Sequence, residues 1–325
     1  MYQLSNAILR KNHKRHKKMF TNIAQPEEFY NKVKGIKSLK LAELTAINSL
    51  SITEKAVAIA KLGKRKIGYM ERLENEAKKE LQRLLLNMTL AGTRSTITRY
   101  RNYIKSQNPE HAILYFFKLP RELNDNLNAN YKKKLKKQVS NLTPISKAEI
   151  ENLIQVAVRD LQSDYYTRLC LALCLLTGRR PTELLLTASM QTTDKPNEVT
   201  FKGQAKEGEI KKGGYNIPVL HCPDKICKAL AKLKSIAPVH DLNVKQGETL
   251  QSALNRRSSK TLAAAARRNY NVKPHELRAL YAEYCTLTLK PSKSSTNSFI
   301  ADILGHNEGD ISTANSYQKF TIIDE

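Results

Sequence analysis

The most constraining feature of this sequence is a long amphipathic pattern between Lys66 and Leu90. Its apolar residues recur every three or four positions, so they form one face of an α-helix. We expect Gly92 to end this helix and Thr93 to cap the next one, which extends to Lys105. The apolar face consists of Ile67, Met70, Leu73, Ala77, Leu81, Leu84, Leu85 and Met88.

Helical patterns dominate the rest of the chain as well. Two short β-like runs, residues 198–206 and 215–220, flank a glycine-containing loop and indicate a hairpin. A further short strand is expected from Phe320 to Ile323. The sequence therefore predicts a mainly α fold with a small β-hairpin or sheet. The other predicted helices cover residues 147–162, 164–177, 223–234, 248–268, 274–289 and 296–304.

The charge of the chain favours a polyanionic partner. The 325 residues carry a formal net charge of +25. Residues 1–141 hold 30 Lys and Arg against 11 Asp and Glu, a net charge of +19, whereas residues 142–325 hold 25 against 19, a net charge of +6. A basic surface can also be merely solvated, or can bind acidic protein or lipid. Because the charge spreads over many helical turns, we favour nucleic acid.

Two basic clusters are candidates for contacts with double-stranded DNA. In the helix at 93–105, arginines alternate with Ser, Thr and Tyr, which suits phosphate and base contacts, although a solvated helix face is the alternative. A lysine cluster precedes residues 138–145, where Asn141 to Pro144 interrupts the helical pattern. The candidates are Arg94, Arg99 and Arg101 in the first cluster and Lys132, Lys133, Lys134, Lys136 and Lys137 in the second.

These patterns divide the chain into three parts. Residues 1–65 form a basic N-terminal arm and helices, and residues 66–141 form a helical DNA-binding domain. Ser146 and Glu149 form a capping box that opens the third part, residues 142–325. The arm at residues 1–18 is expected to become ordered on a phosphate backbone.

The cysteines and the hydropathy indicate a reducing cytoplasm. Five cysteines are too few and too irregularly spaced for a disulfide framework in a chain of this length. Cys222 and Cys227, with His221 beside them, are a candidate metal site, but partly buried thiols are the more frequent arrangement. The longest apolar run, Leu169 to Leu176, is too short to span a membrane, and no signal-peptide pattern opens the chain.

Chemistry-bearing residues gather in the third part. Arg180 precedes Pro181, which suits the first turn of a helix, and Glu183 is placed to hold its guanidinium, although a surface salt bridge would have the same spacing. His275 and Arg278 share one helix face. His306 follows Gly305 at a helix end, 28 residues after Arg278, and Tyr317 follows eleven residues later. Lys206 ends a β-run. Each residue alone is ordinary, and the ordered combination is not.

This ordered set suits attack by a phenol on a phosphodiester, without metal or cofactor. A free tyrosine titrates near pH 10, so it needs neighbouring cations to attack at neutral pH. Two arginines and histidines supply them and stabilise the pentacoordinate transition state. A lysine can protonate the leaving 5′-oxygen. The set consists of Arg180, Lys206, His275, Arg278, His306 and Tyr317.

The same residues resemble the active site of the tyrosine recombinase superfamily over about residues 142–320. The resemblance implies a tyrosine-recombinase-like α+β catalytic domain that follows a basic helical core-binding domain. It also implies that Tyr317 forms a 3′-phosphotyrosyl bond and leaves a 5′-hydroxyl. The Phe201–Lys206 hairpin, the Tyr215–Pro218 return strand and the long spacing from His306 to Tyr317 are most similar to telomere resolvases (protelomerases).

The resemblance implies a DNA cleaving–rejoining enzyme that resolves replicated palindromic telomeres into covalently closed hairpin ends. It places the protein in a prokaryotic nucleoid, associated with a plasmid or phage. Because Phe320 to Ile323 reads as a strand rather than as a helix exchanged between protomers, a homodimer on one inverted repeat is expected. The first alternative is a recombinase or integrase that exchanges strands between two duplexes. The second is a DNA-binding or replication protein that kept the fold without the activity.

Overall fold

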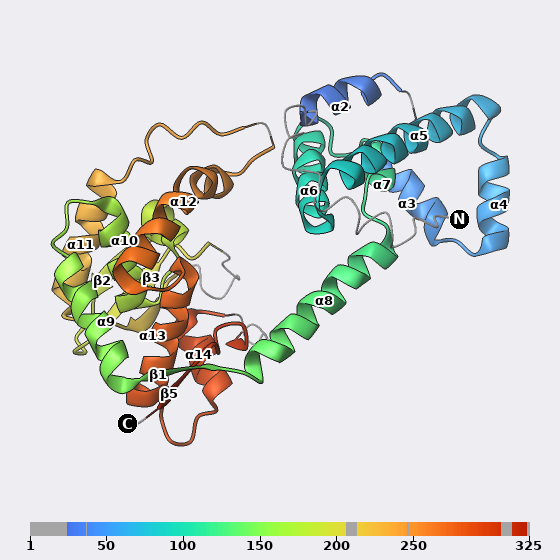
Figure 1. Cartoon of the computed structure of the whole chain (residues 1–325). Helices are drawn as coiled ribbons and strands as arrows, with labels where there is room; N and C mark the ends of the chain where they lie inside the picture. The colour runs from blue at the N-terminus through green and yellow to red at the C-terminus, as the bar shows by residue number, and fades with distance from the viewer. Residues whose placement is uncertain (1–24, 37, 206–212, 246, 307–313, 324–325) are drawn as a thin grey trace. The chain divides into compact units, whose positions relative to one another are not determined.

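The computed structural model describes residues 25–36, 38–205, 213–245, 247–306 and 314–323 (Figure 1). The predicted arm at residues 1–18 and Lys206 lie outside these residues. The described residues form two compact units. One comprises the chain up to Asn130 together with Val244–Thr249, and the other comprises Tyr131–Asn243 and Leu250–Glu325.

The first unit is helical and has one core. Phe29, Leu44, Leu73, Tyr100 and Phe117 are almost fully buried, so helices from before and after residue 66 pack around the same interior. Its helices are α2 (Pro26–Val33), α3 (Leu41–Ser49), α4 (Ile52–Ala60), α5 (Lys64–Asn87), α6 (Leu90–Gln107), α7 (Ile113–Phe116) and the start of α8 (Arg121–Val139).

The boundary between α5 and α6 corrects one expectation from the sequence. Gly92 lies in the first turn of α6 instead of ending α5, and Thr89 is the N-cap, with its Oγ1 accepting from the backbone N of Gly92 at 3.2 Å. Thr93 is fully buried and its hydroxyl donates to the Leu84 carbonyl at 3.4 Å. Both threonines can cap a helix, and the buried position of Thr93 decided between them.

The second unit contains the predicted helices and the predicted hairpin. Ser146 and Glu149 form the expected capping box at the start of α9: the Ser146 backbone N donates to Glu149 at 2.9 Å and the Glu149 backbone N donates to Ser146 Oγ at 3.2 Å. The helices are α9 (Lys147–Asp160), α10 (Tyr166–Thr177), η1 (Glu183–Thr187), α11 (Pro223–Ile236), α12 (Leu250–Tyr270), α13 (Pro274–Leu289) and α14 (Thr296–Leu304).

Two small sheets complete this unit. β3 (Glu198–Lys202) and β4 (Tyr215–Pro218) form the expected antiparallel hairpin, and β2 (Ser189–Thr192), which was not predicted, adds a third antiparallel strand. β1 (Thr143–Ser146) lies in the expected linker and pairs in parallel with β5 (Phe320–Ile323), which was predicted. The register joins Thr143 to Phe320, so the start and the end of the unit meet in one sheet (Figure 1).

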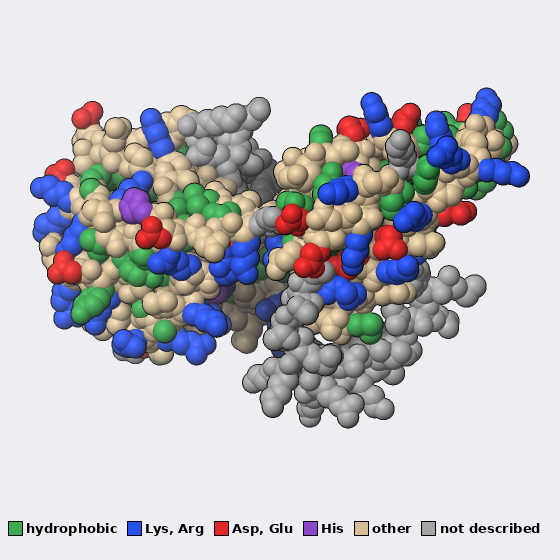
Figure 2. Space-filling view, turned by 90° about the horizontal axis from the view of Figure 1, so that it is seen from above, with side chains coloured by type: hydrophobic (Ala, Val, Ile, Leu, Met, Phe, Trp, Pro, Cys, Tyr) green, Lys and Arg blue, Asp and Glu red, His purple; other side chains and the backbone are tan. Residues whose placement is uncertain are grey.

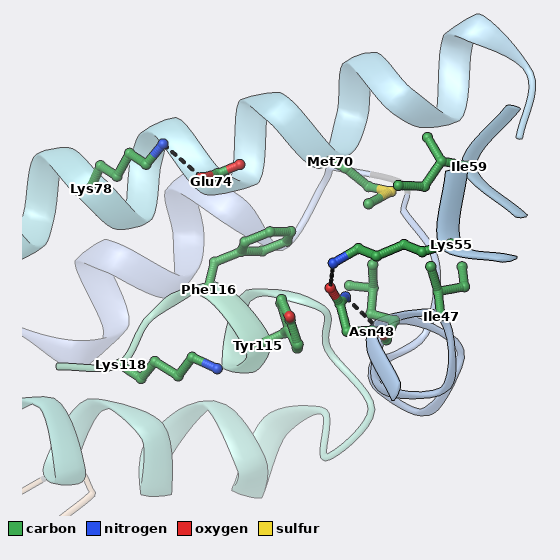
Figure 3. Close-up of a pocket in the computed structure, with 11 residues that line it drawn as sticks. Ile47, Asn48, Lys55, Ile59, Met70, Glu74, Lys78, Tyr115, Phe116 and Lys118 are labelled. Atoms are coloured by element: carbon green, nitrogen blue, oxygen red, sulfur yellow. Dashed lines mark hydrogen bonds and ion pairs between the residues drawn. The ribbon is translucent and has the colours of Figure 1, made fainter. Parts of the chain in front are cut away.

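A pocket of about 430 Å³ lies within the first unit, between α3, α4, α5 and the α7 region (Figure 3). Apolar side chains line it together with Lys55, Lys78 and Lys118. The Lys55 nitrogen pairs with Asn48, the Lys78 nitrogen pairs with Glu74, and the Lys118 nitrogen lies over the Tyr115 ring. Of the six predicted catalytic residues, the five that the structure describes do not line this pocket.

The cysteines of the described residues are free thiols. No group of three or more His, Cys, Asp and Glu with metal-binding geometry occurs among the described residues, the segment around Cys222 and Cys227 included. Within the same residues, no helix is long and apolar enough to cross a membrane.

Gly178 ends α10 in the left-handed conformation, with φ at 66°, and packs against the buried Tyr281 ring. A Cβ at this position would lie 2.2 Å from Tyr281 Cδ1. We therefore predict that Gly178→Ala lowers the free energy of unfolding by about 2–4 kcal/mol, because backbone strain and overpacking add. Urea unfolding followed by circular dichroism measures this change. Gly213→Ala is the control, since nothing lies within 4 Å of a Cβ there; equal stability of both variants would contradict the prediction.

Candidate active site

Tyr317 lies in a turn after Ala314, just before β5, and three predicted catalytic residues surround its phenol. Arg180 Nη2 donates a hydrogen bond to Tyr317 Oη at 3.1 Å. The guanidinium carbon of Arg278 lies 4.9 Å from the centre of the Tyr317 ring. The His306 ring centre is 5.3 Å from the Tyr317 ring centre, with 31° between the ring planes. Four of the six predicted catalytic residues therefore lie together.

Arg180 is held by a buried carboxylate. A helix begins at Pro181 as predicted, and Glu183 lies one turn beyond Arg180. Arg180 Nη1 donates to Glu183 Oε1 at 2.6 Å, and the Arg180 backbone N donates to Glu183 Oε2 at 2.9 Å. Glu183 is fully buried, so this pair is not a surface salt bridge. The backbone N of Ala205, which precedes Lys206, also donates to Glu183 Oε1 at 3.3 Å.

Glu183 remains charged despite its burial. Burial raises the pKa of its carboxyl, but Arg278, Arg180 and Arg179 together outweigh burial and hold the pKa below its ordinary value. The Glu183 carboxylate is thus a fixed negative charge beside the arginines. It orients the Arg180 guanidinium and leaves Arg180 Nη2 directed at the tyrosine oxygen.

Arg278 projects from α13 into the protein and is 2 % exposed. Its Nη1 donates to the Gly178 carbonyl and its Nη2 donates to the Leu304 carbonyl at 2.8 Å. Burial, followed by the charge of Arg179, lowers the pKa of Arg278 to about 10. The side chain therefore stays protonated at neutral pH, and one buried cation faces the tyrosine ring.

Arg179 is a residue of this site that the sequence analysis did not single out. It is fully buried; its Nε donates to the Thr177 carbonyl at 3.1 Å and its Nη2 donates to the Ile303 carbonyl at 2.6 Å. Its guanidinium carbon lies 4.9 Å from the centre of the Phe201 ring. Arg179 therefore ties the end of α10 to the end of α14. The only signal in the sequence was the pair of adjacent arginines.

Two further residues missed by the sequence position the turn that carries His306. Arg179 Nη1 donates to the Tyr215 hydroxyl, the hydroxyl donates to Gln204 Oε1, and Gln204 Nε2 donates to the Gly305 carbonyl at 2.6 Å. Gly305 has φ at 72°, and a Cβ there would lie 1.9 Å from the Tyr215 oxygen. The hairpin thus holds the glycine before His306, and no larger residue fits.

The surroundings of Tyr317 favour its ionised form. Burial raises the pKa of the phenol, but Arg278 and then Arg180 lower it further than burial raises it, through their charges and through hydrogen bonds. The net effect is a pKa below the ordinary value of a tyrosine. The arrangement can therefore supply a phenolate, which is the nucleophilic form of the side chain.

The remaining two predicted catalytic residues are placed differently. His275 is the second residue of α13 and is exposed, and among the described residues it makes no hydrogen bond or ring contact with Tyr317. Burial, Lys319 and Lys273 lower the pKa of its imidazole, while Glu276 opposes them. Lys206 lies outside the described residues. The catalytic roles of both residues stay predictions.

The predicted DNA contacts of the first cluster differ from one another. Arg101 donates to the carbonyls of Leu114 and of Phe117, the latter at 3.0 Å, so its guanidinium is engaged inside the unit. Arg94 is exposed, and its Nη1 donates to Asn128 Oδ1 at 3.2 Å and to Asn124 Oδ1 at 3.4 Å. Arg99 is partly buried beside the Tyr100 ring. This geometry favours Arg94 over Arg101 as a surface contact.

The lysine cluster lies on the second half of α8, a helix that was not predicted, directly before the predicted linker. All five lysines are exposed. Lys and Arg side chains are also distributed over the visible surface of each unit (Figure 2). The cluster comprises Lys132, Lys133, Lys134, Lys136 and Lys137.

Comparison with solved structures identifies the class of fold. A mutant of protelomerase TelA complexed with a DNA hairpin product is similar with a TM-score of 0.70 and 20% identity, covering 98% of this chain and 94% of that one. A second TelA mutant, covalently complexed with substrate DNA, gives 0.70 and 21%, covering 92% and 95%. Protelomerase TelK complexed with substrate DNA gives 0.56 and 18%, covering 98% and 75%. The fold is thus that of the protelomerases.

The family follows from the sequence of the second unit. Residues 141–320 match the family model of the telomere resolvase ResT/TelK catalytic domain. This match covers more than half of the chain, and the chain belongs to this family, as the spacing of its motifs indicated. No curated protein sequence matches it.

We predict that Tyr317 titrates below pH 10, and that Arg180→Gln raises its midpoint because the variant keeps hydrogen-bond donors but removes a positive charge. Tyrosinate absorbance as a function of pH measures this. The chain has 14 tyrosines, so the signal of Tyr317 is the difference between the protein and its Tyr317→Phe variant. A midpoint at or above 10 in the unsubstituted protein would contradict the placement of the phenol between two arginines.

Proposed function

We propose that this protein is a telomere resolvase that acts on double-stranded DNA. It cleaves both strands of a replicated palindromic telomere and rejoins each end as a covalently closed hairpin. The observation that carries the proposal is the Tyr317 oxygen at 3.1 Å from Arg180 Nη2, with Arg278 and His306 against the same ring. The relatives complexed with substrate and hairpin DNA support the substrate class.

The cleavage step uses the phenolate of Tyr317 as the nucleophile. Its oxygen attacks the phosphorus; the bond between phosphorus and the tyrosine oxygen forms while the bond to the 5′-oxygen breaks, which leaves a 3′-phosphotyrosine and a 5′-hydroxyl. Arg180 and Arg278 stabilise the charge that develops on the phosphoryl oxygens. Loss of one such preorganised donor typically costs about 10²–10³-fold in rate. The proton of the phenol leaves to solvent or to a neighbouring base before attack.

The leaving 5′-oxygen needs a proton, and Lys206 is the residue that we assign to this role. The two residues before it support this assignment, since Gln204 donates to the Gly305 carbonyl and the Ala205 backbone N donates to Glu183, the carboxylate that holds Arg180. His306, against the tyrosine ring, is proposed to contact the scissile phosphate. His275 is proposed to join it when DNA is bound.

Rejoining by the 5′-hydroxyl of the complementary strand closes a hairpin. One site holds one nucleophile, so cutting both strands of a palindrome requires two protomers, which we propose are related by the two-fold axis of the DNA. The base pairs between the cuts must open, at a cost of a few kcal/mol. The charge of +19 on residues 1–141 suits contacts that bend and clamp the duplex and so offset this cost.

We predict that purified protein converts a symmetric inverted repeat into two hairpins. The reaction is run in EDTA without nucleotide. The products are melted, cooled rapidly and separated on a native gel, where hairpins are double-stranded because they reanneal at once, whereas open strands stay single. Tyr317→Phe keeps the ring and removes the hydroxyl, so it should bind the same DNA and form neither hairpins nor a covalent protein–DNA adduct.

Two outcomes would overturn this assignment. Junctions between two differently labelled duplexes, without hairpins, would make the protein a recombinase that exchanges strands. An adduct formed by the Tyr317→Phe variant would move the nucleophile to another residue.

A second prediction tests Lys206. We expect Lys206→Ala to slow cleavage by about 10²–10⁴-fold, because the leaving oxygen loses its proton donor. A substrate with sulfur in place of the bridging 5′-oxygen needs little protonation, so it should restore cleavage by this variant. It should not restore cleavage by an Arg180→Gln variant, whose defect lies at the phosphoryl oxygens. Equal rescue of both variants, or of neither, would contradict the assigned role.

A further inference from the structure

The segment that carries Tyr317 is held by a side chain from the lysine-rich helix α8. Gln138 Nε2 donates to the Ser316 carbonyl at 3.3 Å and to the Gln318 carbonyl at 3.4 Å. These carbonyls lie on either side of Tyr317 in the chain. A side-chain amide has two N–H donors, so one glutamine can serve both acceptors at once. Gln138 thus hydrogen-bonds to the backbone on both sides of the nucleophile and not to the phenol itself.

The residues after α8 extend this hold. The Thr143 backbone N donates to the Lys319 carbonyl at 2.8 Å, and β1 then pairs with β5 from Phe320 onward. On the other side, Gln318 Nε2 donates to Asn297 Oδ1 on α14 at 2.6 Å. Tyr317 therefore lies on a short stretch whose backbone is held by the end of α8 and by the strand that follows it, in addition to the hydrogen bond from the Tyr317 backbone N to the Ala314 carbonyl at 2.9 Å.

The last two turns of α8, which contain Gln138, also carry the lysine cluster. Lys134 precedes Gln138 by four residues and so lies on the same helix face. Burial lowers the pKa of the Lys319 ammonium in the segment that carries Tyr317, Glu276 raises it, and the charges of Lys273 and Lys134 lower it further. The other four lysines are exposed and make no ion pair among the described residues. The C-terminal part of α8 therefore carries both the candidate phosphate contacts and the glutamine that hydrogen-bonds to the backbone beside the nucleophile.

We propose that Gln138 is a positioning residue, which holds Tyr317 in line for attack and transmits the engagement of DNA by the end of α8 to the nucleophile. The proposal rests on the function proposed above. It assigns no chemistry to Gln138 itself: the residue acts through the carbonyls of residues 316 and 318.

Two substitutions separate this role from simple packing. Gln138→Met keeps the length of the side chain and removes the donors. Gln138→Glu is nearly identical in shape but presents only acceptors to two carbonyl oxygens. If Gln138 only filled space, Glu would be the milder change; if it donates to the two carbonyls, Glu is the more severe one. Gln155→Met is the matched control, since Gln155 is an exposed helical glutamine in α9 whose side chain makes no hydrogen bond within the described residues.

The rate of adduct formation is measured in a single turnover at saturating inverted-repeat DNA, with the dissociation constant measured separately by fluorescence anisotropy. Gln138→Met is expected to lower the rate about tenfold and to leave DNA binding unchanged, because lost hydrogen bonds to the nucleophile's backbone affect only the step that needs alignment. Gln138→Glu is expected to lower it further, and Gln155→Met to match the unsubstituted protein. Rates within twofold for all variants would overturn the proposal, as would a loss confined to binding.

Hydrogen–deuterium exchange in the protein without DNA tests the same contact independently of activity. The Gln138→Met variant should exchange faster over residues 314–320 and keep its thermal midpoint, whereas unchanged exchange there would overturn the proposal. If the unsubstituted protein forms no adduct with any inverted repeat, the proposed function fails while the exchange result still decides whether Gln138 holds the segment.

Discussion

The active site depends on how the protein accommodates three guanidinium groups in its interior. Arg179 and Arg278 are buried, and Arg180 is mostly so, although buried like charges repel strongly. Glu183 supplies one full counter-charge. Two helix C-termini supply the rest: Thr177 and Gly178 at the end of α10, and Ile303 and Leu304 at the end of α14, direct their carbonyls at the arginines. The negative ends of two helix dipoles thus stabilise the cations.

This arrangement explains the two glycines at the site. Gly178 and Gly305 both have positive φ, which lets each helix stop where its last carbonyls meet an arginine. The neighbouring Tyr281 and Tyr215 leave no space for a Cβ at either position. Each glycine therefore ends a helix, packs in the core and places carbonyls against an arginine. A substitution at either glycine disturbs all three.

Among the described residues, the arginines of the site outnumber the acidic groups that face them. Three arginines face one carboxylate, and the phenol of Tyr317 is the next group able to carry negative charge. A bound phosphodiester would reduce the excess, and the transition state, which carries more charge on the phosphoryl oxygens, would reduce it further. Such a site binds the transition state more strongly than the ground state, which is the requirement for catalysis.

Much of the fold could be predicted from local sequence signals. The helical periods, the capping box at Ser146 and Glu149 and the β3–β4 hairpin depend on residues close together in the chain, and the structure contains them. The order of the catalytic motifs along the chain was sufficient to indicate the family. The start of α6 was placed wrongly because Thr89 and Thr93 have equal capping ability, and only the core around α5 and α6 distinguishes them.

Other features were decided by tertiary structure. β1 contains a proline and lacks the alternation of a half-buried strand, and its partner β5 lies far away in the sequence. The hydrogen bond from Arg179 to the Ile303 carbonyl, the hydrogen-bond chain from Tyr215 through Gln204 to Gly305, and the two hydrogen bonds from Gln138 to the Tyr317 segment all join residues remote in sequence. Thus the sequence by itself determined the helices, the hairpin and the family, because those follow from short-range periodicity and residue order. Only tertiary structure decided what holds the arginines and the tyrosine in place, because those contacts form only when distant helix ends meet in the core.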